Sequence, residues 1–165
     1  MMMAAVVIIA AGFVFPDPFR MPVEGAGNSS FDRRSFWFFP WGKSVTHKGV
    51  DIFAQAGTPV RASVSGIVLF TGEWGRGGKV VFVLAPKWRI HYYAHLKETM
   101  ISRCVFVGYV DVIGTVGNTG NAAGKPSHLH YAVISLFPRP WKNDSRPQGW
   151  RRMWYVDPTP LLTKV

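Results

Sequence analysis

Four of the five histidines in this chain lie in three short strings. These are HKGVD, with His47 and Asp51; YYAHL, with His95; and HLH, with His128 and His130. Imidazole nitrogens and carboxylate oxygens are zinc ligands, and a hydrolytic zinc site keeps three protein ligands and one open position. The strings are therefore typical of a metal site with catalytic neighbours.

The HLH string is expected to begin a strand, because an apolar run, residues 131–134, follows it. Residues two apart in a strand point to the same face of the sheet. His128 and His130 should therefore share one face while Leu129 points to the other. One imidazole can then bind a metal while its neighbour acts on a substrate.

The HKGVD string needs a different geometry, because His47 and Asp51 would lie roughly 13 Å apart in an extended strand. A helix would bring them together, as in zinc peptidases with two histidines one turn apart. However, β-branched residues surround the string and Gly49 lies inside it, which disfavours a helix. The sequence predicts a bend or bulge near Gly49 that turns both side chains toward one ion.

The three strings, in this order and with the glycine-rich run VGNTGNAAGKPS before HLH, resemble the lysostaphin and LytM type of zinc endopeptidase. Members of that family cut peptide cross-bridges of bacterial peptidoglycan. The resemblance extends from about Pro22 to Leu162, and it includes the segments GTPVRASVSGIV and VDPTPLL.

This resemblance implies roles for the five site residues. It makes His47, Asp51 and His130 the ligands of one zinc ion per chain, and it makes His95 and His128 the catalytic pair. It does not say which of the pair acts as the general base. Taken alone, each of these residues could be structural. Their occurrence together in the three strings is what favours a catalytic role.

Other residues are candidates for a substrate groove. The glycine-rich run suggests tight turns in which Asn118 and Thr119 line one edge of the groove, although both could serve the turns alone. Tyr93, in the YYAHL string, is a further groove candidate. His91 is expected on the same strand face as His95, with a structural role or a place in the groove wall.

Length and composition indicate a single globular domain. A chain of 165 residues that is 48% apolar can bury an adequate core. We expect residues 16–165 to form one peptidase domain of the LytM type, with its motif core at about 45–136. The single Cys104 matches no ligand position and is expected to be a small buried residue.

The first fifteen residues carry no charged side chain. This segment is short for a membrane span but suits the apolar core of a signal peptide, and it could also be an anchor or a buried strand. We expect export to the periplasm or cell envelope, with membrane anchoring through residues 1–15 as an open alternative.

The chain is strongly basic, with 19 Lys and Arg against 9 Asp and Glu and a net charge of +10. Such a surface attracts polyanions, including anionic polymers of the cell envelope, or simply keeps the protein soluble. Aromatic and basic residues interleave in RRSFWFFPWGK and GWRRMWYVD, which could stack nucleobases. A nucleic-acid partner would leave the histidine spacing unexplained, so we expect these segments to pack the chain ends together and line a cleft.

Short apolar runs between turn signals predict a mainly β fold. The runs cover residues 60–62, 64–71, 79–84, 89–96, 105–114 and 128–136, and those at 79–84 and 89–96 suggest a hairpin. Helical periodicity is lacking. The resemblance adds the detail of an antiparallel β-sandwich with a substrate groove, a zinc site on the sheet and few or no helices.

The sequence therefore predicts a zinc-dependent endopeptidase that hydrolyses peptide cross-links between peptidoglycan stem peptides. A second hypothesis is a catalytically silent LytM-like module that binds the cell wall or activates another wall hydrolase. Silent members are expected to lose ligands or catalytic histidines, and this chain retains all five matching positions.

Overall fold

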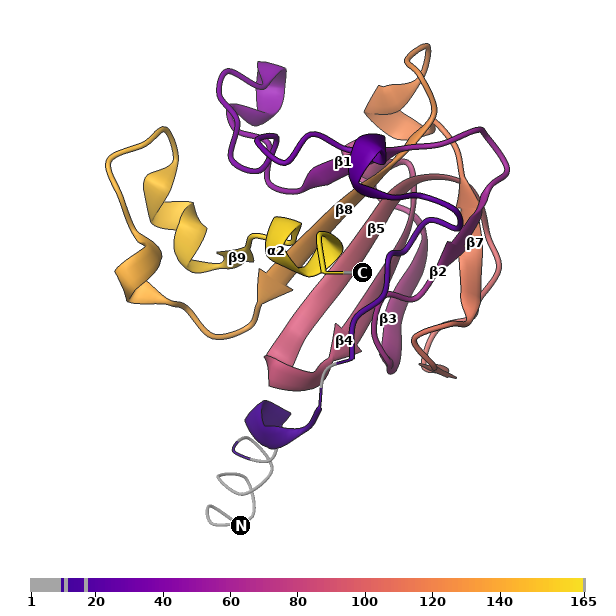
Figure 1. Cartoon of the computed structure of the whole chain (residues 1–165), viewed down its shortest axis with the longest axis horizontal. Helices are drawn as coiled ribbons and strands as arrows, with labels where there is room; N and C mark the ends of the chain where they lie inside the picture. The colour runs from indigo at the N-terminus through magenta and orange to yellow at the C-terminus, as the bar shows by residue number, and fades with distance from the viewer. Residues whose placement is uncertain (1–9, 11, 17, 165) are drawn as a thin grey trace.

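The computed structural model describes residues 10, 12–16 and 18–164, and it confirms a mainly β, antiparallel fold with short helices (Figure 1). The strands are β1 Val50–Phe53, β2 Pro59–Arg61, β3 Gly66–Glu73, β4 Lys79–Ala85, β5 Arg89–Thr99, β6 Phe106–Val107, β7 Val112–Val116, β8 His128–Ser135 and β9 Tyr155–Val156. The helices are α2 Thr159–Leu162 and the 3-10 helices η1 Asn28–Ser30, η2 Gly42–Ser44, η3 Gly75–Gly77, η4 Pro86–Trp88, η5 Gly120–Ala122, η6 Pro140–Lys142 and η7 Gly149–Met153.

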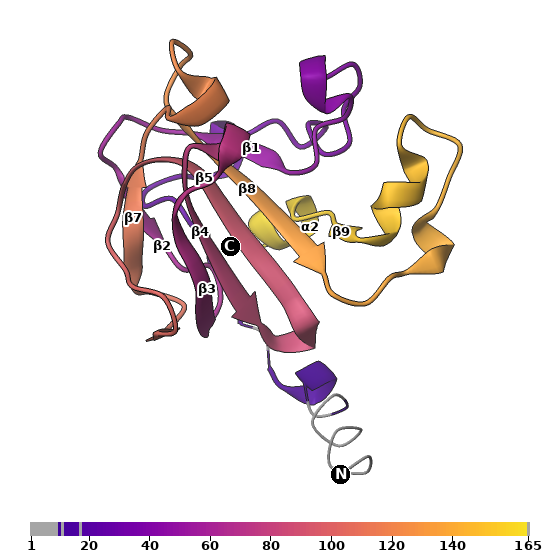
Figure 2. The same cartoon turned by 180° about the vertical axis from the view of Figure 1, so that it is seen from behind.

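The main sheet has the strand order β1-β8-β5-β4-β3-β6, and β7 pairs with both β2 and β5. The expected hairpin at 79–84 and 89–96 is present as β4 and β5. The expected run at 105–114 is divided into β6 and β7 by a turn, in which the backbone N–H of Gly108 donates to Asp111. Seen from behind, η2 and η5 rise at the same end of the sheet as β1 (Figure 2).

Strand β5 changes partner at a bulge. Up to Ala94 it pairs with β8, and from Leu96 onward it pairs with β7. Between them His95 has a positive φ of 63°, which an L residue rarely adopts. The bulge interrupts the alternation of side chains, so that His95 points to the same face as Ala94 while Leu96 returns to the core.

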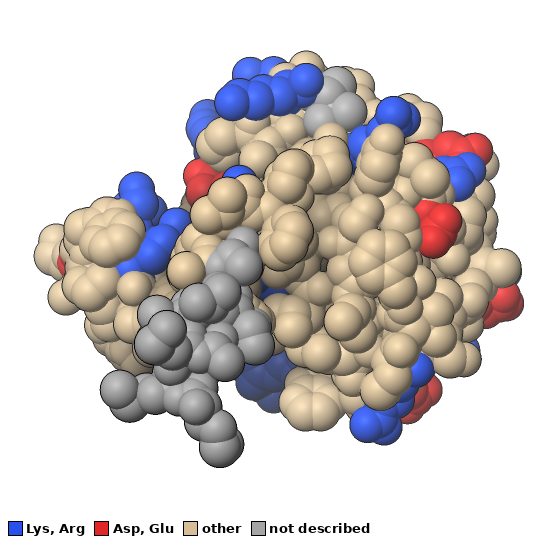
Figure 3. Space-filling view, turned by 90° about the horizontal axis from the view of Figure 1, so that it is seen from below, with Lys and Arg blue, Asp and Glu red and all other residues tan. Residues whose placement is uncertain are grey.

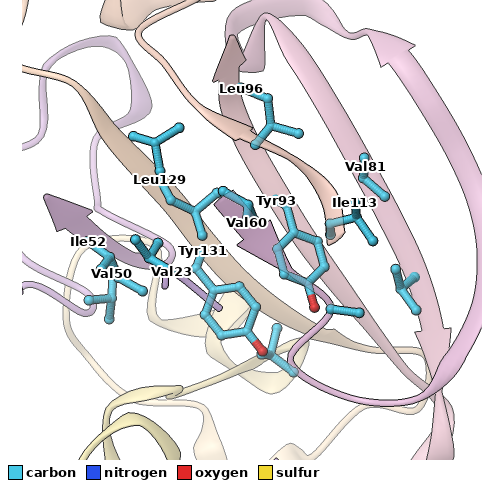
Figure 4. Close-up of a cluster of buried hydrophobic side chains, with 14 of the residues drawn as sticks. Val23, Val50, Ile52, Val60, Val81, Tyr93, Leu96, Ile113, Leu129 and Tyr131 are labelled. Carbon is cyan, nitrogen blue, oxygen red and sulfur yellow. The ribbon is translucent and has the colours of Figure 1, made fainter. Parts of the chain in front are cut away.

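The core lies on the opposite face of β5 and β8 from the side chains of His95, His128 and His130. Figure 4 shows part of this core. Tyr93 and Tyr131 sit side by side in it, with their ring centroids 5.3 Å apart. Tyr93 is fully buried, and its hydroxyl accepts a hydrogen bond of 2.8 Å from the backbone N–H of Ser63. The expectation that Tyr93 lines the groove is wrong, because the bulge at His95 places residues 93 and 95 on opposite faces.

His91 lies in the core by regular alternation with Tyr93, and the bulge turns only His95 to the other face. Its Nδ1 lies 2.6 Å from the hydroxyl of Tyr131, and its side chain is fully buried. The expectation that His91 shares a face with His95 is therefore wrong, whereas its structural role agrees with the sequence analysis. Burial, with a smaller contribution from Arg89, lowers the pKa of His91 to about 3.

Cys104 is exposed, contrary to the expectation of a buried residue. It lies in a turn between β5 and β6 and has a positive φ of 62°. The two aromatic and basic segments pack together as expected. The Trp37 indole N–H donates to the carbonyl of Pro147, and the ring of Trp37 lies 5.7 Å from that of Tyr155.

The N-terminal expectation falls largely outside the described residues, because residues 1–9 and 11 are not among them. Within the part of the chain that is described, no helix is both long and apolar enough to cross a bilayer. The signal or anchor role of residues 1–15 remains a prediction.

The buried His91 predicts a pH-dependent stability. The pKa of His91 falls from 6.5 to about 3 on folding. Between these two pH values the unfolded chain binds a proton at His91 and the folded chain does not. Stability should therefore fall as the pH drops from 7 to 5, with His91 contributing about 2 kcal/mol of the loss. Urea unfolding of the wild type and His91→Phe at both pH values measures this, and an unchanged pH dependence in the variant would contradict it.

Candidate metal centre

Three donor atoms converge where β1 meets β8. Asp51 on β1 lies directly opposite His130 on β8, and Asp51 Oδ1 is 2.8 Å from His130 Nδ1. His47 Nε2 lies 3.1 Å from the same carboxylate oxygen and 3.0 Å from His130 Nδ1. The structure thus brings together all three residues that the resemblance assigns to the metal.

A bend at Gly49 brings His47 to the other two residues, as the sequence predicted. A Cβ atom on Gly49 would lie 2.4 Å from the carbonyl oxygen of Tyr131 and 2.9 Å from the ring of His130. Real Cβ atoms do not approach other atoms so closely. Only a glycine at position 49 therefore allows the backbone of the bend to pass this close to β8. The indole of Trp41 stacks on the ring of His47 at 4.2 Å and covers it.

The donor set fits a divalent cation. His47 Nδ1 donates to the carbonyl of Ser35 at 3.0 Å, so its Nε2 presents a lone pair in the neutral ring. Burial raises the pKa of Asp51, but the nearby imidazoles of His130 and His47 outweigh it and leave the pKa below its usual range. Lone pairs and a carboxylate oxygen this close together repel unless a proton or a metal cation lies between them. Two nitrogens and one oxygen are a ligand set that zinc accepts.

The two other histidines of the strings face the same cavity. His95 Nδ1 donates to the carbonyl of Thr119 at 2.9 Å, and His128 Nδ1 donates to that of Pro126 at 2.8 Å. These bonds leave the Nε2 atom of each neutral ring free to accept a proton. The ring centroids are 5.1 Å apart, and His128 Nε2 is 3.8 Å from Oδ2 of Asp51.

The His95 imidazole is held neutral. Burial, followed by the nearby His130 and His128, lowers its pKa to about 4 and outweighs the opposing hydrogen bond to Thr119. At neutral pH the ring therefore carries a lone pair on Nε2. A neutral imidazole beside a metal site can act as a base toward water.

These groups line a cavity of about 590 Å³. About half of the other lining residues are aromatic or basic. The aromatic lining comprises Trp41, Phe53, Trp74, Phe82, Tyr92 and Tyr155, and the basic lining comprises Lys48, Arg76 and Lys125. Trp41 and Tyr155 belong to the two aromatic and basic segments, so these segments do line the cleft as the sequence predicted.

The expected groove residues Asn118 and Thr119 lie beside the cavity and do not line it. Thr119 instead fixes the site: its hydroxyl donates to the carbonyl of Leu96 at 2.8 Å, and its carbonyl holds His95. Asn118 is exposed, and its amide donates to the carbonyl of Lys125 at 3.4 Å. The glycine-rich loop contributes Asn121, Ala122 and Lys125 to the wall instead.

The sequence analysis did not identify several residues that line the cavity, although strand alternation indicated some of them. Phe53 follows Asp51 by two positions on β1, so alternation alone places it on the site face, where it contacts His128. Tyr92 precedes Ala94 on β5 in the same way. It was missed because the bulge at His95 cannot be seen in the sequence.

A β-sheet that carries two imidazoles, a carboxylate and a second pair of histidines in one cavity defines a metallopeptidase. The chain belongs to peptidase family M23, whose family model matches residues 45–143.

Individual relatives agree with this family. The chain is 32% identical over 156 residues to an L-Ala--D-Glu endopeptidase of Bacillus subtilis, covering 87% of this chain and 42% of that one. It is 33% identical to the peptidoglycan DD-endopeptidase ShyA of Vibrio cholerae over 118 residues, which cover 70% and 26% of the two chains. The chain thus spans less than half the length of these relatives.

The fold also matches a solved structure. The catalytic domain of the antimicrobial peptidase lysostaphin from Staphylococcus simulans superposes with a TM-score of 0.63 at 26% identity. The match covers 78% of this chain and 88% of that domain.

The geometry predicts one zinc ion per chain. The His130→Ala variant should lose most of the metal, because removing one of three ligands leaves too few. The matched control His95→Ala should retain it, because His95 lies outside the ligand set. Metal analysis after dialysis against micromolar zinc measures both. Full zinc retention in His130→Ala would contradict the ligand set.

Proposed function

We propose that this chain is a zinc-dependent endopeptidase that hydrolyses peptide cross-links of bacterial peptidoglycan. The observation that carries this proposal is the convergence of His47, Asp51 and His130 in a cavity that also holds His95 and His128. Membership of family M23, and relatives named as peptidoglycan endopeptidases, support the substrate class.

In this proposal His47, Asp51 and His130 hold one zinc ion. Bound there, zinc would supply Lewis acidity that polarises a scissile carbonyl and makes water a better nucleophile near neutral pH. Asp51 contributes the negative charge that partly offsets the cation. The hydrogen bond from His47 to Ser35 fixes which nitrogen of that ring faces the ion.

His95 and His128 form the proposed catalytic pair. Because the Nδ1 of each ring donates to a backbone carbonyl, each Nε2 faces the cavity with its lone pair. One Nε2 accepts the proton of the attacking water. The other, once protonated, donates to the developing oxyanion or to the leaving amine.

The aromatic walls orient the peptide. Burial, with a smaller effect of Tyr155, raises the pKa of Tyr92 to about 12, so its hydroxyl stays protonated at neutral pH. Its ring lines the cavity 6.1 Å from that of His130, and in this proposal its hydroxyl is a hydrogen-bond donor for the substrate. Together with Trp41 and Phe53 it also limits the water around the site.

The silent-module hypothesis is less favoured. A module that only binds the wall does not need two further histidines whose backbone hydrogen bonds leave both Nε2 atoms facing a metal site. In this chain both His95 and His128 have such bonds.

The substrate class suggests a cellular location. An enzyme that cuts peptidoglycan must reach the cell wall, so we propose export to the periplasm or cell envelope, with residues 1–15 as the signal or anchor. Lys and Arg are scattered over the face shown in Figure 3 and outnumber Asp and Glu in the chain. Such a surface favours association with anionic envelope polymers.

The His95→Ala variant tests the proposed mechanism. It should retain zinc yet lose on the order of 10²-fold or more in hydrolysis of purified peptidoglycan, the usual contribution of a general acid or base. Release of soluble fragments measures the rate, and mass spectrometry of the fragments identifies the bond that is cut.

His91→Phe is the matched control, because His91 lies in the core and should not affect the rate at pH 7. Hydrolysis by His95→Ala within a few-fold of the wild type would refute its catalytic role. A zinc-loaded wild type that binds peptidoglycan without cutting it would support the silent module instead.

A further inference from the structure

The charged side chains around the cavity are mostly cationic. Three cationic side chains line it, those of Lys48, Arg76 and Lys125. The single carboxylate in the lining is that of Asp51, which is largely buried and engaged with the histidines of the metal site. Within the described residues none of the three cations forms an ion pair, so the cleft has a surplus of positive charge that a bound zinc ion would increase.

Two of these cations are held together by Ser44. The Arg76 guanidinium, on the turn between β3 and β4, donates to the Ser44 hydroxyl at 3.3 Å. The Lys48 ammonium donates to the Ser44 carbonyl at 2.9 Å and to the carbonyl of Thr46 at 3.3 Å. These acceptors are neutral, so they orient the two cations without cancelling their charge.

Like charges held near each other without a counter-ion repel, and an anion placed between them removes that repulsion. A guanidinium also presents two parallel N–H donors that match the oxygens of a carboxylate. Arg76 is exposed, and its present contact is one long bond to the neutral hydroxyl of Ser44. Replacing this weak hydrogen bond by a charge-assisted bond to a carboxylate therefore loses little binding energy and gains a stronger interaction.

We propose that Arg76 and Lys48, assisted by Lys125, bind a free carboxylate of the substrate peptide and make the enzyme selective for it. This rests on the proposed function and names the feature of the cross-link that the cleft recognises. The aromatic lining and the catalytic histidines surround a peptide-sized cavity, which favours a carboxylate of the cleaved peptide itself over a separate polyanion.

Two synthetic cross-linked stem-peptide dimers test the proposal. They are identical except that one carries free carboxylates and the other carries carboxamides at the same positions. The zinc-loaded wild type should cut the carboxylate dimer with a kcat/KM about threefold to fivefold higher, as expected for an ion pair with an exposed guanidinium. Added salt should narrow this difference.

The Arg76→Met variant should lose most of its rate on the carboxylate dimer and keep its rate on the carboxamide dimer. Lys43→Met is the matched control, because Lys43 is exposed on η2 beside Ser44 but does not line the cavity. It removes the same charge and should leave the preference intact. Arg76 is exposed, so its replacement should not disturb folding, and an unchanged zinc content and melting temperature would verify this.

Equal cleavage of the two dimers by the wild type would overturn the proposal, as would an equal loss on both dimers in Arg76→Met. A loss of preference in Lys43→Met as large as in Arg76→Met would reduce the effect to general surface charge and would also overturn it. Cleavage of neither dimer by the zinc-loaded wild type would contradict the proposed function itself, and the selectivity with it.

Discussion

The site depends on one constraint, the close crossing of the HKGVD bend over β8. The pairing of β1 with β8 sets Asp51 opposite His130, but it cannot deliver a third ligand. That ligand arrives because Gly49 has no side chain, which lets the backbone turn against Tyr131 and bring His47 within 3.1 Å of Asp51. Strand pairing and one glycine thus convert two segments 79 residues apart into a single ligand set.

A second constraint places the catalytic pair beside these ligands. His128 reaches the site by strand alternation alone, two residues before His130. His95 does not, because regular alternation along β5 would have sent it into the core. Its positive φ and the change of partner from β8 to β7 turn it toward the cavity, and the carbonyl of Thr119 holds it there. Such backbone strain is often found at functional sites.

Much of this could be predicted from the sequence. Period-two alternation gave the shared face of His128 and His130, and the glycine within HKGVD gave the bend. The hairpin of β4 and β5 followed from two apolar runs around a short turn. The wrong predictions on β5 have one cause: a bulge leaves no trace in the hydrophobic pattern, so the relative faces of His91, Tyr93 and His95 were predicted wrongly. The exposure of Cys104 depends on a turn whose conformation composition does not reveal.

The central claim is that two imidazoles and one carboxylate share a single zinc ion. X-ray absorption at the zinc edge of the zinc-loaded protein tests it most directly. The account predicts about four nitrogen or oxygen neighbours at roughly 2.0–2.2 Å, with outer-shell scattering from two imidazoles. In His47→Ala, scattering from one imidazole should disappear. Sulfur ligation, or an imidazole signal that His47→Ala leaves unchanged, would contradict it.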